Sequence, residues 1–235
     1  FVSKYRLGGV AQWTFGMEDM AASQAIRSAA LAIAPDQVIS TIESSTGSIE
    51  SAAALEFGSI FGLKASFQLP DKLPISNLLV RIETKAANET QWREIATSTT
   101  GVDGIIQVPL LLSKSSMIRA RTDATWERLE SISAEVSVVI ARRISVSAPV
   151  SAVRSQPLQI TGTLAPRQSG VPLQLLQQRA GKWIPVGSPV LTDLNGLFTI
   201  STTVEQKGFA KYMVRVAKDA QWNQADSEVF TVVIR

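Results

Sequence analysis

The segment LKASFQL at residues 63–69 recurs in altered form as LQITGTL at residues 158–164, and this pair decides the fold. In both segments apolar residues alternate with small or polar residues, which is typical of a β-strand with one buried face. Short alternating runs bounded by Gly, Pro, Asn, Asp and Ser fill the chain from about residue 36 onward. The pattern therefore predicts an all-β sandwich or barrel that contains an internal duplication.

Further features recur in the same order, with partners about 91 to 96 residues apart. The pairs are Trp92 with Trp183, Gly104 with Gly196, Arg119 with Arg215, Trp126 with Trp222, and Ile140 with Ile234. This spacing is too long for a solenoid repeat and is close to the ~100 residues of an immunoglobulin-like sandwich. We predict a mainly β chain with two tandem immunoglobulin-like β-sandwiches, at residues 36–142 and 143–235. No Pro/Gly/Ser linker separates them, so we expect limited hinge freedom at Ala141-Arg142-Arg143.

Two kinds of repeated residue have an expected structural role. The Asp103-Gly104 and Asn195-Gly196 dipeptides predict tight hairpins, because both central residues of a type I′ turn need positive φ. Arg119 and Arg215 are expected in strands, where they face solvent or pair with a nearby carboxylate.

The composition excludes several classes of chemistry. The 235 residues include no cysteine and no histidine, so a thiol nucleophile, a Ser-His-Asp triad, a structural zinc site and a haem ligand are excluded within this chain. The aspartates are too scattered for a calcium loop, and we predict no metal and no cofactor. Dispersed charges give a net charge of +3 without a basic patch for nucleic acid. No stretch reaches the ~18 apolar residues that a membrane span requires.

The first 35 residues differ in kind from the rest. An apolar run at 9–15 predicts a buried strand, and apolar residues at helical spacing predict a helix over Met17–Ile33, ended by Ala34-Pro35. Glu18 and Asp19 lie where negative charge favours a helix N-terminus. The chain begins at Phe1, which we interpret as a fragment or a processed product.

The segment YRLGGVAQWTFGMED at residues 5–19 resembles the last strand and the start of the last helix of the catalytic barrel in glycoside hydrolase family 18, the chitinase-like family. The shared pattern is G-G-V-A-x-W-x-x-G-x-E-D, and the resemblance covers about 30 of the 235 residues. It implies that residues 1–35 are an incomplete remnant of a (β/α)8 barrel, with Trp13 on the face where sugars bind. Core packing is the alternative for Trp13. The family's acidic D-x-x-D-x-D-x-E run is absent, so we assign no catalytic residue and expect this chain alone to be inactive.

The other tryptophans have two interpretations. Trp92, Trp126, Trp183 and Trp222 are candidate platforms for a polysaccharide or cell-wall glycan, because an indole face complements the apolar face of a sugar ring. The alternative is packing in the core or at a sheet edge.

Three functions remain open from the sequence. The modules resemble bacterial immunoglobulin-like or fibronectin-III-like domains that follow catalytic domains in secreted enzymes. That resemblance implies the C-terminal region of a secreted or cell-surface family-18-like protein, whose parent acts on chitin or peptidoglycan-type polysaccharide. The modules would then serve as spacers, cell-wall attachment or polysaccharide-binding units. Alternatively, stacked modules form a filament or surface layer, in which the first residues pack against an upstream barrel or a neighbouring subunit. Adhesin modules are the third possibility.

Overall fold

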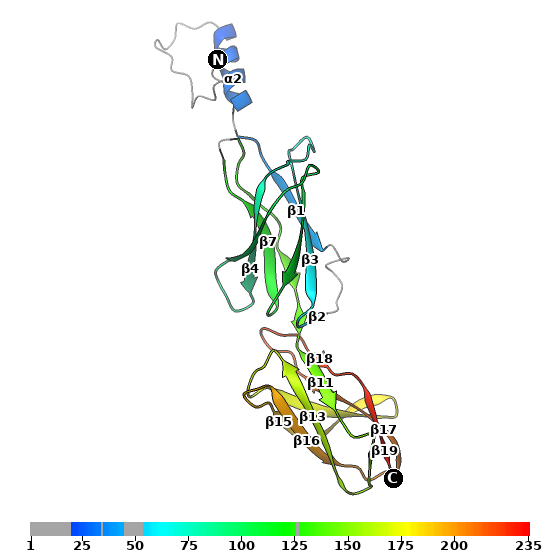
Figure 1. Ribbon diagram of the computed structural model, residues 1–235. Coiled ribbons are helices and arrows are strands. Elements are labelled where there is room, and N and C mark those ends of the chain that lie inside the picture. The colour runs from blue at the N-terminus through cyan, green and yellow to red at the C-terminus, as the bar shows by residue number, and fades with distance from the viewer. Residues whose placement is uncertain (1–19, 34, 45–53, 126) are drawn as a thin grey trace.

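The computed structural model describes residues 20–33, 35–44, 54–125 and 127–235. Within them the chain forms a helix, α2 (Met20–Ile33), followed by short strands arranged in two bodies (Figure 1). The predicted helix is confirmed over these residues, and its side chains from 20 to 28 are exposed. The predicted strand at 9–15 and Trp13 lie outside the described residues.

The first body is a sandwich of two antiparallel sheets with strand orders β1-β3-β6 and β5-β4-β7-β8, and β9 also pairs with β7. A short parallel pair joins β2 to β10. The strands are β1 (Ile39–Ser44), β2 (Leu55–Glu56), β3 (Ile60–Gln68), β4 (Leu79–Ala86), β5 (Arg93–Thr99), β6 (Ile105–Leu111), β7 (Ser116–Thr122), β8 (Ser131–Ile132), β9 (Val136–Val138) and β10 (Ile140–Ala141).

The second body repeats this order, with one sheet β11-β13-β16 and a facing sheet β12-β19-β17-β14-β15, to which β18 adds on β17. The pair β12·β19 is parallel, like β2·β10. The strands are β11 (Arg143–Ser147), β12 (Ser151–Ala152), β13 (Pro157–Ala165), β14 (Pro172–Arg179), β15 (Lys182–Leu191), β16 (Leu197–Thr203), β17 (Gly208–Val216), β18 (Ala225–Asp226) and β19 (Phe230–Ile234). The protein is therefore mainly β, with two tandem immunoglobulin-like sandwiches.

Each sandwich has its own core because its strands alternate between buried and exposed side chains. In β3, for example, Phe61, Leu63, Ala65 and Phe67 are buried. Burial of each large apolar side chain stabilises the fold by about 1.5–3 kcal/mol. Apart from Trp222, the buried residues of the two clusters come from separate parts of the chain, before Arg142 for the first and after it for the second.

The repeat is in register at the turns that precede β6 and β16. Gly104 and Gly196 both have φ of 72°, and their carbonyls accept the N–H groups of Phe67 (2.9 Å) and Leu164 (2.8 Å), respectively. Phe67 is therefore the counterpart of Leu164, whereas the sequence pairing placed it opposite Gly162. The correction is two residues, and because the side chains of a strand alternate with a period of two, the same residues of each strand still face the core.

The two glycine turns are not the predicted hairpins. Only Gly104 and Gly196 in these dipeptides have positive φ, so neither turn is type I′. Each turn also joins strands of different sheets, β5 to β6 and β15 to β16. A Cβ on Gly104 would lie 2.5 Å from the Phe67 oxygen, and one on Gly196 would lie 2.7 Å from the Leu164 oxygen. Close backbone approach between the sheets therefore requires glycine at both positions.

Buried serines provide a second match between the modules. Ser133 accepts the N–H of Ala120 at 2.9 Å, and Ser227 accepts the N–H of Val214 at 2.9 Å. In return, the N–H groups of Ser133 and Ser227 donate to the carbonyls of Ala120 and Val214. These contacts tie the segment after β8 or β18 to the centre of β7 or β17.

The serine contacts also correct the pairing of the strand arginines. They place Arg121, rather than Arg119, in the position of Arg215. Arg215 forms a bidentate ion pair with Asp226 at 2.6 and 2.7 Å, and Arg121 contacts Glu130 at 2.8 Å. The expectation that the strand arginines pair with a nearby carboxylate is confirmed for Arg215 and for Arg121, and also for Arg119, which contacts Glu83 at 2.7 Å.

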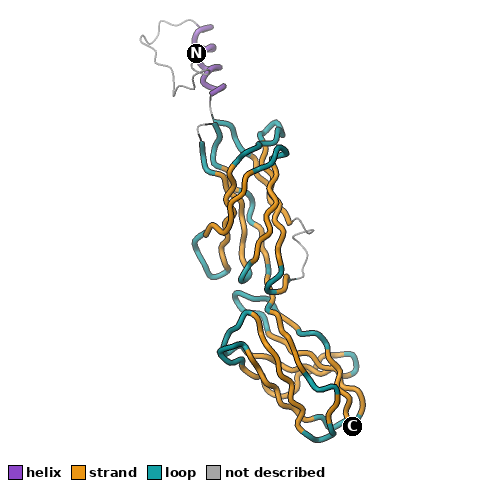
Figure 2. The backbone as a smooth tube through the Cα atoms, in the orientation of Figure 1, coloured by secondary structure: helices purple, strands orange, loops and turns teal. Residues whose placement is uncertain are grey.

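The two sandwiches lie end to end, with α2 beyond the first and the C-terminus at the far end of the second (Figure 1). Loops of both sandwiches meet between them (Figure 2). No described helix is long and apolar enough to cross a membrane.

Candidate functional site: the junction between the sandwiches

The junction has a very short covalent connection. Strand β10 ends at Ala141 and β11 begins at Arg143, so one residue, Arg142, connects them. Side chains and backbone groups of both sandwiches meet at this junction.

Trp222 crosses the junction from the second sandwich. It lies in the turn between β17 and β18, where the Asp219 carboxylate accepts the N–H groups of Gln221 (2.8 Å) and Trp222 (2.9 Å). The Trp222 side chain is 5% exposed and belongs to the buried cluster of the first sandwich. It meets the ring of Phe57 edge-on, with 5.7 Å between centroids and an interplanar angle of 62°. A residue of the second sandwich thus completes the core of the first.

Arg142 is buried between the two bodies and is 4% exposed. Its Nη1 donates to Asp219 Oδ2 at 2.7 Å, and its Nη2 donates to Gln168 Oε1 at 3.0 Å. Its guanidinium carbon lies 5.1 Å from the centroid of the Trp222 ring. A buried cation is stable only when it is paired and hydrogen-bonded, and both partners here are in the second sandwich.

The pKa of Asp219 is lowered by this environment. Partial burial alone would raise it, but hydrogen bonds from the Gln221 N–H, the Arg142 guanidinium and the Trp222 N–H outweigh that effect. The carboxylate is therefore ionised at neutral pH, and it both shapes the tryptophan turn and neutralises Arg142.

Backbone hydrogen bonds hold the same turn against the first sandwich. The Ser115 N–H donates to Gln221 O at 3.0 Å, and the Asn223 N–H donates to Ile140 O at 2.8 Å. Ser115 Oγ also accepts the N–H of Ile140 at 2.9 Å. These bonds connect the β6–β7 loop, the end of β10 and the turn of the second sandwich, so the contact is not made by side chains alone.

An open groove of about 780 Å³ runs beside the junction. Its polar lining includes Glu56, Arg143 and Glu228, and Asp226 contributes a carboxylate already paired with Arg215. Charges of both signs line the groove, so it does not select a strongly charged ligand.

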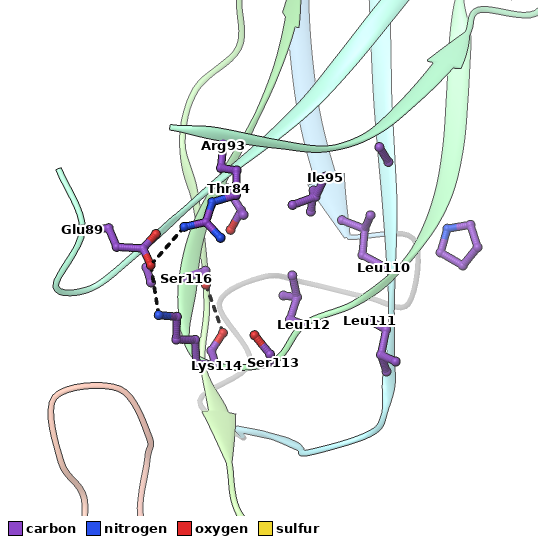
Figure 3. Close-up of a pocket in the computed structure, with 13 residues that line it drawn as sticks. Thr84, Glu89, Arg93, Ile95, Leu110, Leu111, Leu112, Ser113, Lys114 and Ser116 are labelled. Carbon is purple, nitrogen blue, oxygen red and sulfur yellow. Dashed lines mark hydrogen bonds and ion pairs between the residues drawn. The ribbon is translucent and has the colours of Figure 1, made fainter. Parts of the chain in front are cut away.

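A smaller recess of about 250 Å³ lies between the edge strands β5 and β6 of the first sandwich (Figure 3). Leu110, Leu112 and Ile95 line one side, while Glu89 and Lys114 form an ion pair at 3.0 Å on the other. The hydrogen bond from Lys114 lowers the pKa of Glu89. Glu89 is thus ionised and neutralised by its partner, which does not favour a general acid or base.

Two of the predicted glycan platforms, Trp92 and Trp183, lie apart from each other. Trp92 is half-buried, with Lys85 Nζ 4.6 Å and Arg119 Cζ 4.2 Å from its ring centroid. Trp183 is half-buried on β15, opposite Gln178 of β14. The two rings belong to different sandwiches, whereas Trp13 and Trp126 lie outside the described residues.

Trp222, which is also a predicted platform, is more deeply buried than Trp92 and Trp183. Its ring is enclosed in the junction and offers no face to a sugar in this arrangement. The repeat counterpart of Trp222 is also not Trp126. Asp219 accepts the N–H of Trp222, and in the first sandwich Thr125 Oγ1 accepts the N–H of Arg128 in the same way. Arg128 therefore takes the place of Trp222 in the first sandwich. The sequence did not reveal this junction residue, because Trp126 and Trp222 lie 96 residues apart and match as a repeat pair.

Comparisons with known proteins add little at the level of sequence. No protein-family model and no curated protein matches the chain. Among solved structures, the D0-D1 domain of intimin is similar, over 83% of this chain and 100% of that one, with 13% identity and a TM-score of 0.31. The C-terminal 282-residue fragment of intimin, in complex with the intimin-binding domain of the translocated intimin receptor, is similar over 75% of this chain and 58% of that one, with 16% identity and a TM-score of 0.36. The immunoglobulin-like assignment rests on this chain's own strand order, and the comparisons give no support to a glycoside hydrolase origin.

Proposed function

We propose that the chain is a rigid two-module spacer of a surface-associated or extracellular protein, with modules at residues 36–142 and 143–235. The observation that carries the proposal is the burial of Trp222 in the core of the preceding module. A flexible tether would leave each module with a complete core and a polar end. Here, the first module lacks a complete core unless the second is docked.

The energetics favour a closed junction. Separating the modules would expose Trp222 and Phe57 and would break the backbone bonds to Gln221 and Asn223. Loss of a buried tryptophan contact costs about 3–5 kcal/mol by analogy with Trp→Ala substitutions. Even at ~3 kcal/mol the open form would be populated below about 1%, since 1.4 kcal/mol corresponds to a factor of ten. A spacer of this kind holds whatever it carries at a fixed distance and orientation.

The proposal is tested by a distance distribution across the junction. The chain has no cysteine, so introduced cysteines at Gln107 and Thr199, which are both exposed strand residues, carry spin labels at those sites only. Double electron–electron resonance is expected to give one narrow distribution, and Trp222→Ala is expected to broaden it. A broad distribution in the unaltered protein would show independent modules and contradict the spacer.

Polysaccharide contact is a second candidate function, favoured by the half-exposed indoles of Trp92 and Trp183. Arg119 is held by Glu83 at 2.7 Å and its guanidinium lies over the Trp92 ring, where it can hydrogen-bond a sugar that contacts the rest of the indole. Retention on insoluble chitin or peptidoglycan is expected to fall in a Trp92→Ala/Trp183→Ala variant. Equal retention of the variant and the unaltered protein would remove this candidate.

The origin of the spacer in a family-18-like glycoside hydrolase is a proposal from residues 5–19 alone. It is tested by the reading frame that encodes the protein, in which an acidic D-x-x-D-x-D-x-E strand is expected upstream of residue 1. A frame without that strand would remove the glycosidase parent while leaving the spacer untouched.

A further inference from the structure

The far end of the second sandwich exposes apolar side chains. Val150 and Phe209 are each 82% exposed, and Val153 is 61% exposed. Together with the exposed Arg154 they form what we call the C-terminal face. Phe209 pairs with Val233 of β19, Val150 accepts the Val233 N–H, and Arg154 donates to Arg235, so these residues lie beside the end of β19. The C-terminus lies at the end of the second sandwich opposite the junction (Figure 1). Isolated apolar residues are common on protein surfaces, so the position of these residues within the repeat matters more than their exposure.

The C-terminal face is the counterpart of the surface that receives Trp222 on the first sandwich. The pair Ser116↔Val138 in β7·β9 corresponds to Ala210↔Val232 in β17·β19. The preceding residue, Phe209, therefore takes the place of Ser115, which binds the tryptophan turn through its N–H group.

The parallel pairs give the other equivalences. Arg154 donates its N–H to Arg235 O at 3.0 Å, just as Phe57 donates to Ala141 O at 2.8 Å. Arg154 therefore takes the place of Phe57, the ring that touches Trp222, and Val153 takes the place of Glu56. On this face a guanidinium stands at the position of the Phe57 ring, and a phenyl and an isopropyl group stand at the positions of Ser115 and Glu56, so it is suited to an indole.

We propose that the C-terminal face is a docking surface for a further immunoglobulin-like module, which presents a tryptophan-bearing turn like that of Asp219–Trp222. The inference rests on the proposed spacer function, because it extends the same mode of stacking by one step. The occupant is defined by its chemistry: an indole buried against Phe209 and Val153, with the face of its ring toward Arg154. The exposed apolar residues are thus the uncovered half of a second junction.

An extended chain tests this inference. A second copy of residues 142–235 is appended directly after Arg235, since Arg235 corresponds to Ala141 in the repeat. The appended copy brings its own arginine, aspartate and tryptophan at the junction positions, so only the receiving face differs from the native junction. Spin labels at Thr199 and at Thr199 of the appended copy report the new junction, and labels at the equivalent pair Gln107 and Thr199 report the native one.

We expect the new junction to give a single narrow distribution with a mean distance close to that of the native junction. A Val153→Asp/Phe209→Asp variant is expected to broaden the new distribution at least twofold. The matched control, Val102→Asp, changes an apolar residue that is 90% exposed on the first sandwich and should leave both distributions unchanged. The native-junction labels in each variant report whether the original chain is still folded.

Each other outcome has a defined meaning. A narrow distance distribution at the native junction with a broad one at the new junction would overturn the docking surface but leave the spacer intact. A broad distribution at the native junction would overturn the spacer itself. A new junction that stays narrow in the aspartate variant would show that the C-terminal face does not hold the module. Concentration-dependent end-to-end association of the unextended chain, abolished by Phe209→Asp, would assign the face to a second copy instead and contradict the proposed occupant.

Discussion

Replacing Trp222 with alanine should uncouple the sandwiches without unfolding the second one. The buried cluster of the second sandwich does not include Trp222, whereas that of the first does. Trp→Ala in a well-packed site costs about 3–5 kcal/mol. The loss of stability should therefore fall mainly on the first sandwich and the junction. It should raise the population of molecules with an open junction by about two to four orders of magnitude.

Urea denaturation measures the stability of each sandwich separately when a fluorophore is placed at Thr97 for the first sandwich or at Thr199 for the second. In Trp222→Ala the midpoint of the first sandwich should fall, and that of the second should change little. Trp183→Ala is the matched control, because this half-buried tryptophan lies on β15 of the second sandwich and should lower only that midpoint. If Trp222→Ala destabilised the second sandwich as much as the first, the assignment of its side chain to the first core would be refuted.

Four further predictions concern the junction aspartate, the buried serines and the turn glycines. Asp219→Asn leaves buried Arg142 without its ion pair, and calorimetry should show junction coupling reduced by about 1–3 kcal/mol. The pKa of Asp219 is lowered in the folded protein, so its stabilisation of the junction is fully present above the unfolded pKa of about 3.9 and is lost as the pH falls through the folded pKa. The distance distribution between the spin labels should therefore broaden in acid. Asp219→Asn should remove this pH dependence. Ser133→Ala and Ser227→Ala each leave a buried N–H unpaired, and each should cost about 1–3 kcal/mol in its own sandwich alone, as read by the two fluorophores. Gly104→Ala and Gly196→Ala place a Cβ against a carbonyl oxygen, and each should lower the thermal midpoint of its own sandwich. Gly170→Ala is the control for backbone strain, because Gly170 has a φ of 75° but nothing lies within 4 Å of the added Cβ.

The fold was predictable because the signals that define it are local and repeated. Alternation in segments 63–69 and 158–164 marks the buried face of a strand whatever its partner, and glycine turns recur at matching places. The pairing of the two repeats was wrong by two residues at three places, including Arg119 with Arg215. An error of two residues keeps the same side chains on the same face, so periodicity could not reveal it.

The junction was only partly predictable. The absence of a linker indicates a short connection, and one residue, Arg142, separates β10 from β11. The partners of Arg142 are 26 and 77 positions away in the sequence. Contacts of such separation depend on how two folded bodies meet, which no local pattern encodes. For the same reason the sequence does not distinguish the tryptophans, although Trp222 is buried between the modules while Trp92, just before β5, and Trp183, on β15, are half-exposed.

The central claim, that the modules form one rigid body, is tested most directly by residual dipolar couplings of backbone amides in weakly aligned protein. We predict that couplings from residues 54–125 and 143–235 fit a single alignment tensor, with the same magnitude and orientation for both sandwiches. Two tensors of different magnitude would show that the modules reorient independently, and the spacer with a fixed junction would then be wrong.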